Sequence, residues 1–400
     1  MREFVFPDPS LTSRAGQFVW LAINIEEEKN APFLVKFPGE GVPTFAVVDP
    51  KDESVALRLV GSMTVPQLHA FLDNARIAVA GGGGSVREAD AALRAADQHY
   101  GARRYEQAAE SYRLALSQAP ADWAPYGRAV EALLFSYQQL AFLRDGASAH
   151  NRCVELAQSA RKRLAGTPSE LNAAIAGLDC TLALKDETPD KAARVADTEA
   201  EVRRLVADPK AAGAADDVSG AYGSLLEARR AAKDEAGARR TAEDWAAYLD
   251  AAAARAQTPG QRSVFDSHRL TVYLELKQPE RAIPMLEASE RDFPQDYNPP
   301  ARLAAAYQAM KEWDKALAAA DRALPLVYGP RKLRVLDIKA EVLKSKGDQA
   351  AARRTLAEAV AFADALPPGQ RSESRVAGLR KKLDSWKSEP GTPPPSPPPS

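Results

Sequence analysis

The chain has 400 residues, enough for two or three domains, and a formal net charge of −1. A nearly neutral chain has no overall field that attracts DNA, RNA or an anionic membrane, so we expect no nucleic-acid partner. The sequence contains no apolar run of eighteen residues, and we therefore expect no membrane-spanning helix. Its two cysteines, Cys153 and Cys180, are too few for a disulfide framework and do not indicate a compartment.

The beginning of the chain leaves two alternatives for the compartment. Met1 is followed by a mixed acidic segment rather than by a basic stretch and an apolar core, so no signal peptide is predicted. Taken as written, the sequence indicates a cytoplasmic protein. If the natural start lies upstream, a signal peptide would be lost with it, and the alternative is an exported, periplasmic protein.

Strand-like patterns recur in residues 1–80. The apolar run Phe18–Ile25 is rich in β-forming residues and predicts a buried strand. Thr44–Val48 predicts a second buried strand. The alternating residues Ser54–Leu59 predict a third strand, which closes a hairpin across the turn at residues 49–52.

Two helices are expected in the same region. Residues 26–37 predict a helix that Pro38-Gly39 ends. The other helix follows Thr64, an expected N-cap with Gln67 three residues further on in the capping-box position, and it runs to about Ala78. The resulting order is strand–helix–strand–strand–helix, an α+β arrangement.

Residues 41–49 read Gly-Val-Pro-Thr-Phe-Ala-Val-Val-Asp. This segment resembles the cis-proline loop and third core strand of thioredoxins, and residues 1–9 are similar to the end of the active-site helix in the DsbD-γ-like branch of that family. The resemblance implies a cis peptide bond before Pro43 and a substrate edge lined by Val42, Pro43 and Thr44. It also implies a Cys-x-x-Cys pair that would lie just before residue 1; no cysteine precedes the loop in this chain.

The linker and the remainder of the chain follow a different pattern. Residues 81–85 read Gly-Gly-Gly-Gly-Ser, which predicts a flexible linker between residues 1–80 and residues 86–387. Residues 86–387 are rich in alanine, charged and helix-periodic. The proline-rich residues 388–400 predict a disordered or polyproline II tail.

The helical region contains an internal repeat. Ala108, Tyr112, Ala115 and Pro120 resemble the tetratricopeptide signature, and Ala282–Ala316 spans the 34-residue period of that repeat. Further positions that fit the pattern are Leu286, Ala320, Ala323, Ala352, Leu356 and Ala359. The resemblance implies an all-α solenoid of helical hairpins, each burying its apolar face by stacking on the next.

Parts of this region depart from the repeat. Residues 123–208 are predicted to be helical but do not match the pattern. Thr167-Pro168-Ser169-Glu170 predicts a helix start there, with a capping box and a proline at the first helical position. Leu379–Trp386 predicts a closing helix that shields the last repeat.

No group of residues indicates catalysis. The chain has no Gly-x-Ser-x-Gly elbow and no phosphate-binding Gly-x-x-x-x-Gly-Lys-Ser/Thr loop, and its four histidines are not spaced as zinc ligands. We therefore predict no catalytic residue, no metal and no cofactor in this chain. Cys153 and Cys180 lie within helical patterns, away from an identifiable activating cation, and predict buried, unreactive thiols.

Three functions are compatible with these patterns. The leading one is a protein–protein interaction adaptor that binds a peptide or a partner domain in the groove of its repeats. The alternative, from the resemblance to thioredoxins, is a bacterial thiol–disulfide oxidoreductase of cell redox homeostasis whose Cys-x-x-Cys lies upstream. The third is an assembly factor in which the thioredoxin-like part only docks. The resemblance to thioredoxins also implies that the middle strand of the sheet, which precedes the Cys-x-x-Cys, is missing from this chain. We therefore expect residues 1–80 to be loosened, because the flanking strands would lose backbone hydrogen-bond partners.

Overall fold

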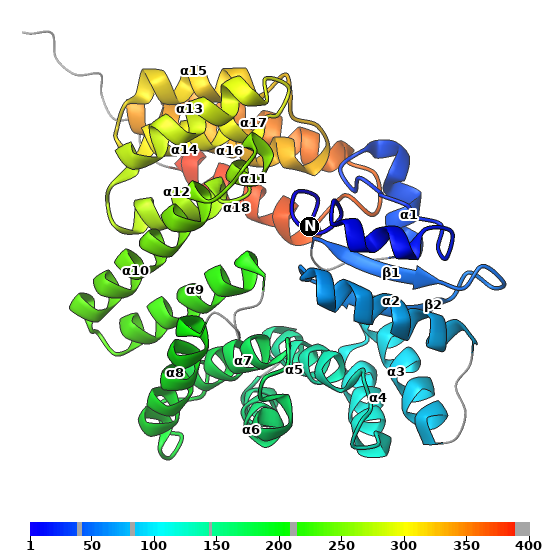
Figure 1. The fold of residues 1–400 in the computed structure, drawn as a ribbon. Coiled ribbons are helices and arrows are strands. Elements are labelled where there is room, and N and C mark those ends of the chain that lie inside the picture. The colour runs from blue at the N-terminus through cyan, green and yellow to red at the C-terminus, as the bar shows by residue number, and fades with distance from the viewer. Residues whose placement is uncertain (38–41, 81–84, 144–145, 209–213, 389–400) are drawn as a thin grey trace, which may run out of the picture. The chain divides into compact units, whose positions relative to one another are not determined.

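The computed structural model describes most of the chain in five stretches, residues 1–37, 42–80, 85–143, 146–208 and 214–388 (Figure 1). Its contacts form two compact units. Unit 1 comprises Met1–Phe18 and Gly39–Trp245, and unit 2 comprises Val19–Pro38 and Ala246–Ser400. A short N-terminal segment thus belongs to the unit that the C-terminal residues build, a division that differs from the expected boundary at residues 81–85.

Unit 1 begins with a β-hairpin and a helix. The strands predicted at Thr44–Val48 and Ser54–Leu59 are confirmed as β1 (Thr44–Val48) and β2 (Val55–Val60), and they pair antiparallel with Ala46 opposite Arg58. The helix α2 (Val65–Ala80) packs on β2. The apolar core between them is formed by buried side chains, among them Leu57, Met63, Leu68, Phe71 and Leu72.

The predicted start of α2 is confirmed in detail. The Thr64 hydroxyl accepts the Gln67 amide N–H at 3.4 Å, and the Gln67 side chain accepts the Thr64 amide N–H at 2.7 Å. This reciprocal capping box satisfies two amides that the first turn of a helix leaves without partners.

The prediction of a strand at Phe18–Ile25 is wrong. These residues form no regular element, and Val19 and Leu21 are 88% and 75% exposed. A β-forming run becomes a strand only where a neighbouring strand offers it backbone partners. In the described residues β1 and β2 pair with each other alone, and residues 19–38 belong to unit 2 instead.

The predicted helix at residues 26–37 is confirmed in part. A 3-10 turn (η2, Glu28–Asn30) is followed by a short helix, α1 (Ala31–Lys36). Pro32 lies in the first turn of α1, where its missing N–H costs no hydrogen bond, but it would break a helix that ran through it. The helix therefore begins only at Ala31.

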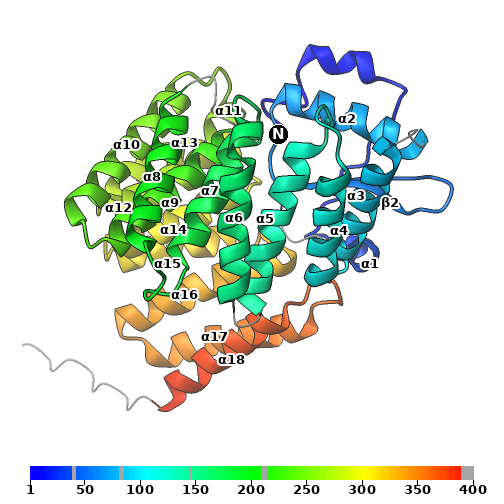
Figure 2. The same ribbon diagram turned by 90° about the horizontal axis from the view of Figure 1, so that it is seen from below.

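The remainder of unit 1 is helical. Its helices are α3 (Ser85–Gly101), α4 (Tyr105–Gln118), α5 (Tyr126–Leu143), α6 (Ala147–Leu164), α7 (Glu170–Leu182), α8 (Lys191–Ala207), α9 (Ala215–Ala231) and the first part of α10 (Glu235–Ala254). A 3-10 turn, η1 (Pro9–Arg14), precedes them. Helices α5, α6 and α7 pack side by side (Figure 2). Ala108 and Ala115 are fully buried where α3 and α4 pack as a hairpin, as the repeat pattern predicts.

The predicted helix start, with Thr167 as N-cap and Pro168 as the first helical residue, lies two residues too early. Helix α7 begins at Glu170, and the Ser169 side chain makes no capping hydrogen bond. The Glu170 carboxylate instead accepts the Gly166 amide N–H at 2.6 Å, which holds the preceding residues in a turn.

Unit 2 contains the most regular hairpins. Its helices are α1, the last part of α10, α11 (Pro259–Ser263), α12 (Asp266–Glu275), α13 (Ala282–Asp292), α14 (Asn298–Ala309), α15 (Trp313–Ala323), α16 (Lys332–Lys346), α17 (Gln349–Ala365) and α18 (Glu373–Ser388). Two 3-10 turns, η3 (Pro279–Arg281) and η4 (Gly329–Arg331), precede α13 and α16. The pairs α14/α15 and α16/α17 are helical hairpins, and α18 packs on α17 as the predicted closing helix.

The packing of unit 2 follows the repeat pattern. Ala282, Leu286, Ala316 and Ala352 are all fully buried. Small side chains at these positions let paired helices approach closely, and the leucines fill the space beside them. An all-α arrangement of stacked hairpins is therefore established by the helices themselves.

Two predicted segments lie outside the described residues. These are residues 81–84 of the glycine linker and residues 389–400 of the proline-rich tail. Among the helices that the structure describes, none combines the length and the apolar character needed to cross a bilayer.

Candidate interaction site

The loop expected to form a substrate edge lies directly before β1. The Val42–Pro43 peptide bond is cis. Val42 is 60% exposed, Pro43 and Thr44 are partly buried, and the Pro43 carbonyl accepts the Gly61 amide N–H at 2.9 Å. The loop is therefore fixed to the end of β2, with the Val42 side chain at the surface. The role of these three residues as a substrate edge stays a prediction.

The outer edge of β2 is closed by the helices of unit 1. The Arg58 amide N–H donates to Oδ2 of Asp97 on α3 at 3.1 Å, and the Arg58 carbonyl accepts Nη1 of Arg128 on α5 at 2.5 Å. Both backbone groups of Arg58 thus bond to side chains in place of a third strand. An edge capped in this way cannot pair with another chain.

Asp97 is the centre of this closure. Its side chain is 1% exposed and forms an ion pair with Arg128 at 3.1 Å. Its Oδ1 accepts the Tyr112 hydroxyl at 2.7 Å, and burial, together with the charge of Asp97, raises the pKa of Tyr112. A buried carboxylate with three donors is well compensated, so this network fixes the β-hairpin on α3, α4 and α5.

The edge of β1 is open at Ala46. Residues opposite each other in an antiparallel pair point their backbone groups either at each other or away from each other. Arg58 points its N–H and carbonyl away from β1, so Ala46, which lies opposite, points its own away from β2. Ala46 is exposed, and in the part of the chain that the structure describes its backbone has no hydrogen-bond partner.

A row of polar side chains crosses the first helices of successive hairpins. Glu131 on α5, Asn172 on α7 and Asp217 on α9 form this polar row, in which Asn172 donates to Glu131 at 3.3 Å. Burial raises the pKa of Glu131 to about 7 and that of Asp217 to about 6. The charge of Asp217 adds to the rise at Glu131, and the charge of Asp216 adds to the rise at Asp217.

The polar row lies beside the β-hairpin of the same unit. Arg128, one turn before Glu131, bonds to β2, and Ser62, two residues after β2, donates to Asp216 on α9 at 2.7 Å. β2 therefore contacts α5, and the connection between β2 and α2 contacts α9. The helices of unit 1 hold the N-terminal hairpin as a docked element.

Sequence reasoning did not find these residues. Asp97, Arg128 and Glu131 lie in helices where alanines on several faces blur the amphipathic pattern, so a charge at an inward position is not recognisable. A buried charge is detectable only once the partner that compensates it is known.

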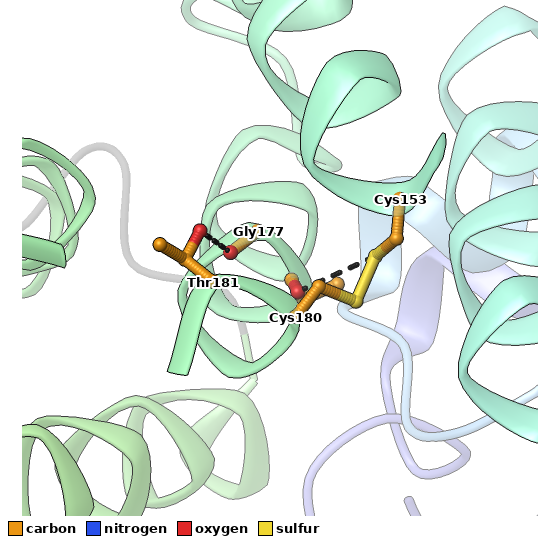
Figure 3. Close-up of a disulfide and its surroundings, with 5 residues drawn as sticks. Cys153, Gly177, Cys180 and Thr181 are labelled. Carbon is orange, nitrogen blue, oxygen red and sulfur yellow. Dashed lines mark hydrogen bonds between the residues drawn. A yellow bond between two sulfur atoms is a disulfide. The ribbon is translucent and has the colours of Figure 1, made fainter. Parts of the chain in front are cut away.

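The two cysteines form a disulfide bond. Cys153 on α6 and Cys180 on α7 are joined and fully buried (Figure 3). The prediction of buried, unreactive positions is confirmed for burial, but the pairing was not predicted. Because the repeat pattern fails in residues 123–208, the sequence does not show that these two helices are neighbours.

The described residues contain no cluster of three His, Cys, Asp or Glu side chains that is arranged to hold a metal ion. The disulfide lies on α6 and α7, whereas the loop at Val42–Thr44 contacts β2.

Comparison with known proteins gives weak likenesses only. No protein-family model matches the chain, and a search of curated proteins gives no match. A TPR2AB-domain:pHSP90 complex of yeast Sti1 is 16% identical, covers 76% of this chain and 100% of its own, and has a TM-score of 0.27. A thermophilic TPR protein of Thermus thermophilus is 17% identical, with 75% and 98% covered and a TM-score of 0.25. Yeast Tom70 is 12% identical, with 76% and 96% covered and a TM-score of 0.16. These scores are too low to establish a shared fold, so the repeat assignment rests on the hairpins themselves.

Proposed function

We propose that this protein is a protein–protein interaction adaptor whose helical hairpins present the edge of β1 to an extended segment of a partner protein. The observation that carries the proposal is the contrast between the two edges of the β-hairpin. Asp97 and Arg128 close the edge of β2, while Ala46 leaves the edge of β1 exposed. Strand addition at an open edge is a common mode of peptide recognition.

The geometry defines the chemistry of the partner. Phe45 and Val47 pack into the core with α2, which holds the backbone of β1, while the outward N–H and carbonyl of Ala46 remain available. The partner segment would bond through its own main chain, and the exposed Val42 side chain would contact it at one end. A groove along the repeats, predicted from the sequence, remains a second surface of the same adaptor.

Substitution of Ala46 tests this proposal. Ala46→Pro removes the outward N–H and leaves the β1–β2 hydrogen bonds intact, because Ala46 does not take part in them. Ala46→Val is the matched control, since it keeps the N–H and favours a strand. We expect partner proteins captured by the full chain to be lost with Ala46→Pro and retained with Ala46→Val, as measured by quantitative mass spectrometry. Equal capture by both variants would refute the proposal.

Thiol–disulfide exchange stays a prediction from the resemblance alone. In this chain both sulfur atoms are buried and joined to each other. Because the implied Cys-x-x-Cys would lie upstream of Met1, an insulin-reduction assay on a protein extended upstream checks the activity, with the 400-residue chain as the background. A rate above that background would favour the enzyme over the adaptor.

We further propose that the protein works in an oxidising compartment, because disulfide bonds persist mainly there. Closing a loop of 27 residues between Cys153 and Cys180 stabilises the fold by about 3–4 kcal/mol. A thiol reductant should therefore lower the melting temperature of the wild type and leave that of the Cys153→Ser/Cys180→Ser variant unchanged. Alkylation of both thiols in freshly isolated native protein, without prior reduction, would contradict the assignment of the compartment.

A further inference from the structure

Unit 2 holds a segment from the other end of the chain. Residues 24–37 lie against the loop that contains η4, before α16, and against the loop before α18, with α1 beside the latter (Figure 1). The first loop connects two successive hairpins, and the second connects the last hairpin to the closing helix α18. The docked segment begins in a turn and continues through the 3-10 turn η2 into the helix α1.

Side chains of both loops bond to the segment. The Asn24 side-chain amide donates to the Tyr328 hydroxyl at 2.7 Å, and the Glu26 carboxylate pairs with Arg331 at 2.5 Å. Gln370 donates its side-chain amide to the Ile25 carbonyl at 2.9 Å. Two of these contacts therefore bind side chains of the segment, and the third binds its main chain.

Gln370 shows that the surface is built for an occupant. The residue is 7% exposed, and its side-chain amide bonds to the Ile25 carbonyl across the contact with the segment. A buried amide without a partner costs free energy, so Gln370 needs a main-chain carbonyl of an occupant at this position.

Two glycines let the segment approach closely. A Cβ on Gly329 would lie 2.1 Å from the Glu26 carbonyl oxygen, and a Cβ on Gly369 would lie 2.9 Å from the Ala31 carbonyl oxygen. Both glycines also have positive φ. Any larger residue at these positions would displace the segment's backbone. Glycine at both positions therefore allows the backbone of a peptide to lie directly on these loops.

We propose that the loops before α16 and α18 form a recognition site for an acidic peptide segment, and that residues 24–37 occupy this site in cis. The chemistry that it reads is an amide side chain, a free main-chain carbonyl and a carboxylate in successive residues, as in Asn24-Ile25-Glu26. A partner segment with this chemistry would compete with the chain's own segment. The site consists of residues of unit 2, whereas β1 belongs to unit 1, and its test is independent of the adaptor surface proposed above.

The test first vacates the site in the full-length chain. Asn24→Ala with Glu26→Arg removes the bond to Tyr328 and places two cations together at Arg331. We expect hydrogen exchange of the amides in residues 26–37 to rise at least about tenfold, with the circular dichroism of the helices retained. Unchanged exchange would show that these contacts do not hold the segment, and would overturn the proposal.

A labelled synthetic peptide of residues 22–37 then serves as the probe. Fluorescence anisotropy should show binding at least about tenfold tighter to the vacated variant than to the wild type, because the tethered segment competes at a high effective concentration. Adding Gly329→Ala to the vacated variant should abolish binding, since the new methyl group occupies the place of the peptide backbone.

Gly347→Ala is the matched control. Gly347 also has positive φ, but no atom lies within 4 Å of a Cβ at that position, so this change has the backbone cost without the clash. It should leave peptide binding intact. No binding to the vacated variant, or binding that survives Gly329→Ala, would show that the contact is only internal packing and would overturn the proposal.

Discussion

At the scale of single residues, Asp97 decides how the β-hairpin is attached. It is the only negative charge within bonding distance of Arg128 among the described ion pairs, and two nitrogens of that guanidinium already have no hydrogen-bond partner. Asp97→Asn keeps the shape and removes the charge, leaving a largely buried cation without compensation. We expect a loss of about 3–5 kcal/mol in the urea unfolding free energy of unit 1.

A matched substitution separates the charge from the hydrogen bond in this network. Tyr112→Phe removes one neutral donor to Asp97 and should cost about 1 kcal/mol. If both variants cost the same, the ion pair is not the dominant contribution and the attachment rests on packing.

Glu131 makes the stability of unit 1 depend on pH. Its pKa rises from 4.5 in the unfolded chain to about 7 in the folded one, so ionisation opposes folding and stability falls as the pH rises through that interval. The effect is at most about 3 kcal/mol. Glu131→Gln keeps an acceptor for Asn172 and should raise the melting temperature by a few degrees at pH 8, with little change at pH 4.5.

The control for this pH dependence is Glu155→Gln, which removes an exposed carboxylate on α6. Its effect on the melting temperature should be small and similar at both pH values. A Glu131→Gln variant as stable as the wild type at pH 8 would contradict the assigned burial of that carboxyl.

At the scale of elements, the small residues of the repeats are the testable feature. Ala318 and Ala320 lie on the same helix, α15, but Ala318 is exposed and Ala320 is fully buried. Ala320→Leu overfills the space between paired helices and should cost about 1–3 kcal/mol in a thermal unfolding experiment, whereas Ala318→Leu should be nearly neutral. Equal effects would mean that close helix approach is not what the alanines provide.

The elements also show what the sequence can predict. The strands at β1 and β2, the capping box at Thr64 and the buried alanines of the repeats follow from local patterns, and the structure confirms them. The strand predicted at Phe18–Ile25 does not form, because β propensity is a local property whereas a strand needs a partner strand elsewhere in the chain. The disulfide and the closure of β2 by Asp97 depend on which helices are neighbours, and local periodicity does not contain that information.

At the scale of the whole molecule, the chain enters unit 2 twice. Residues 19–38 belong to it although residues 1–18 and those from 39 onward belong to unit 1. A cut between Arg255 and Ala256, in the exposed loop after α10, breaks the covalent connection to α11–α18. The docked residues 24–37 remain on the N-terminal fragment and can still bind to the C-terminal fragment.

We therefore expect the two fragments to stay together after a protease site inserted at that loop is cleaved. Size-exclusion chromatography under native conditions should show co-elution of residues 1–255 with residues 256–400. The Asn24→Ala/Glu26→Arg variant should release a larger free fraction at the same concentration, because it lacks the bonds to Tyr328 and Arg331. Identical elution of the cleaved wild type and variant would show that the bonds of Asn24 and Glu26 do not help to hold the two fragments together. The presence of residues 19–38 in unit 2 would then not stabilise the association of the fragments.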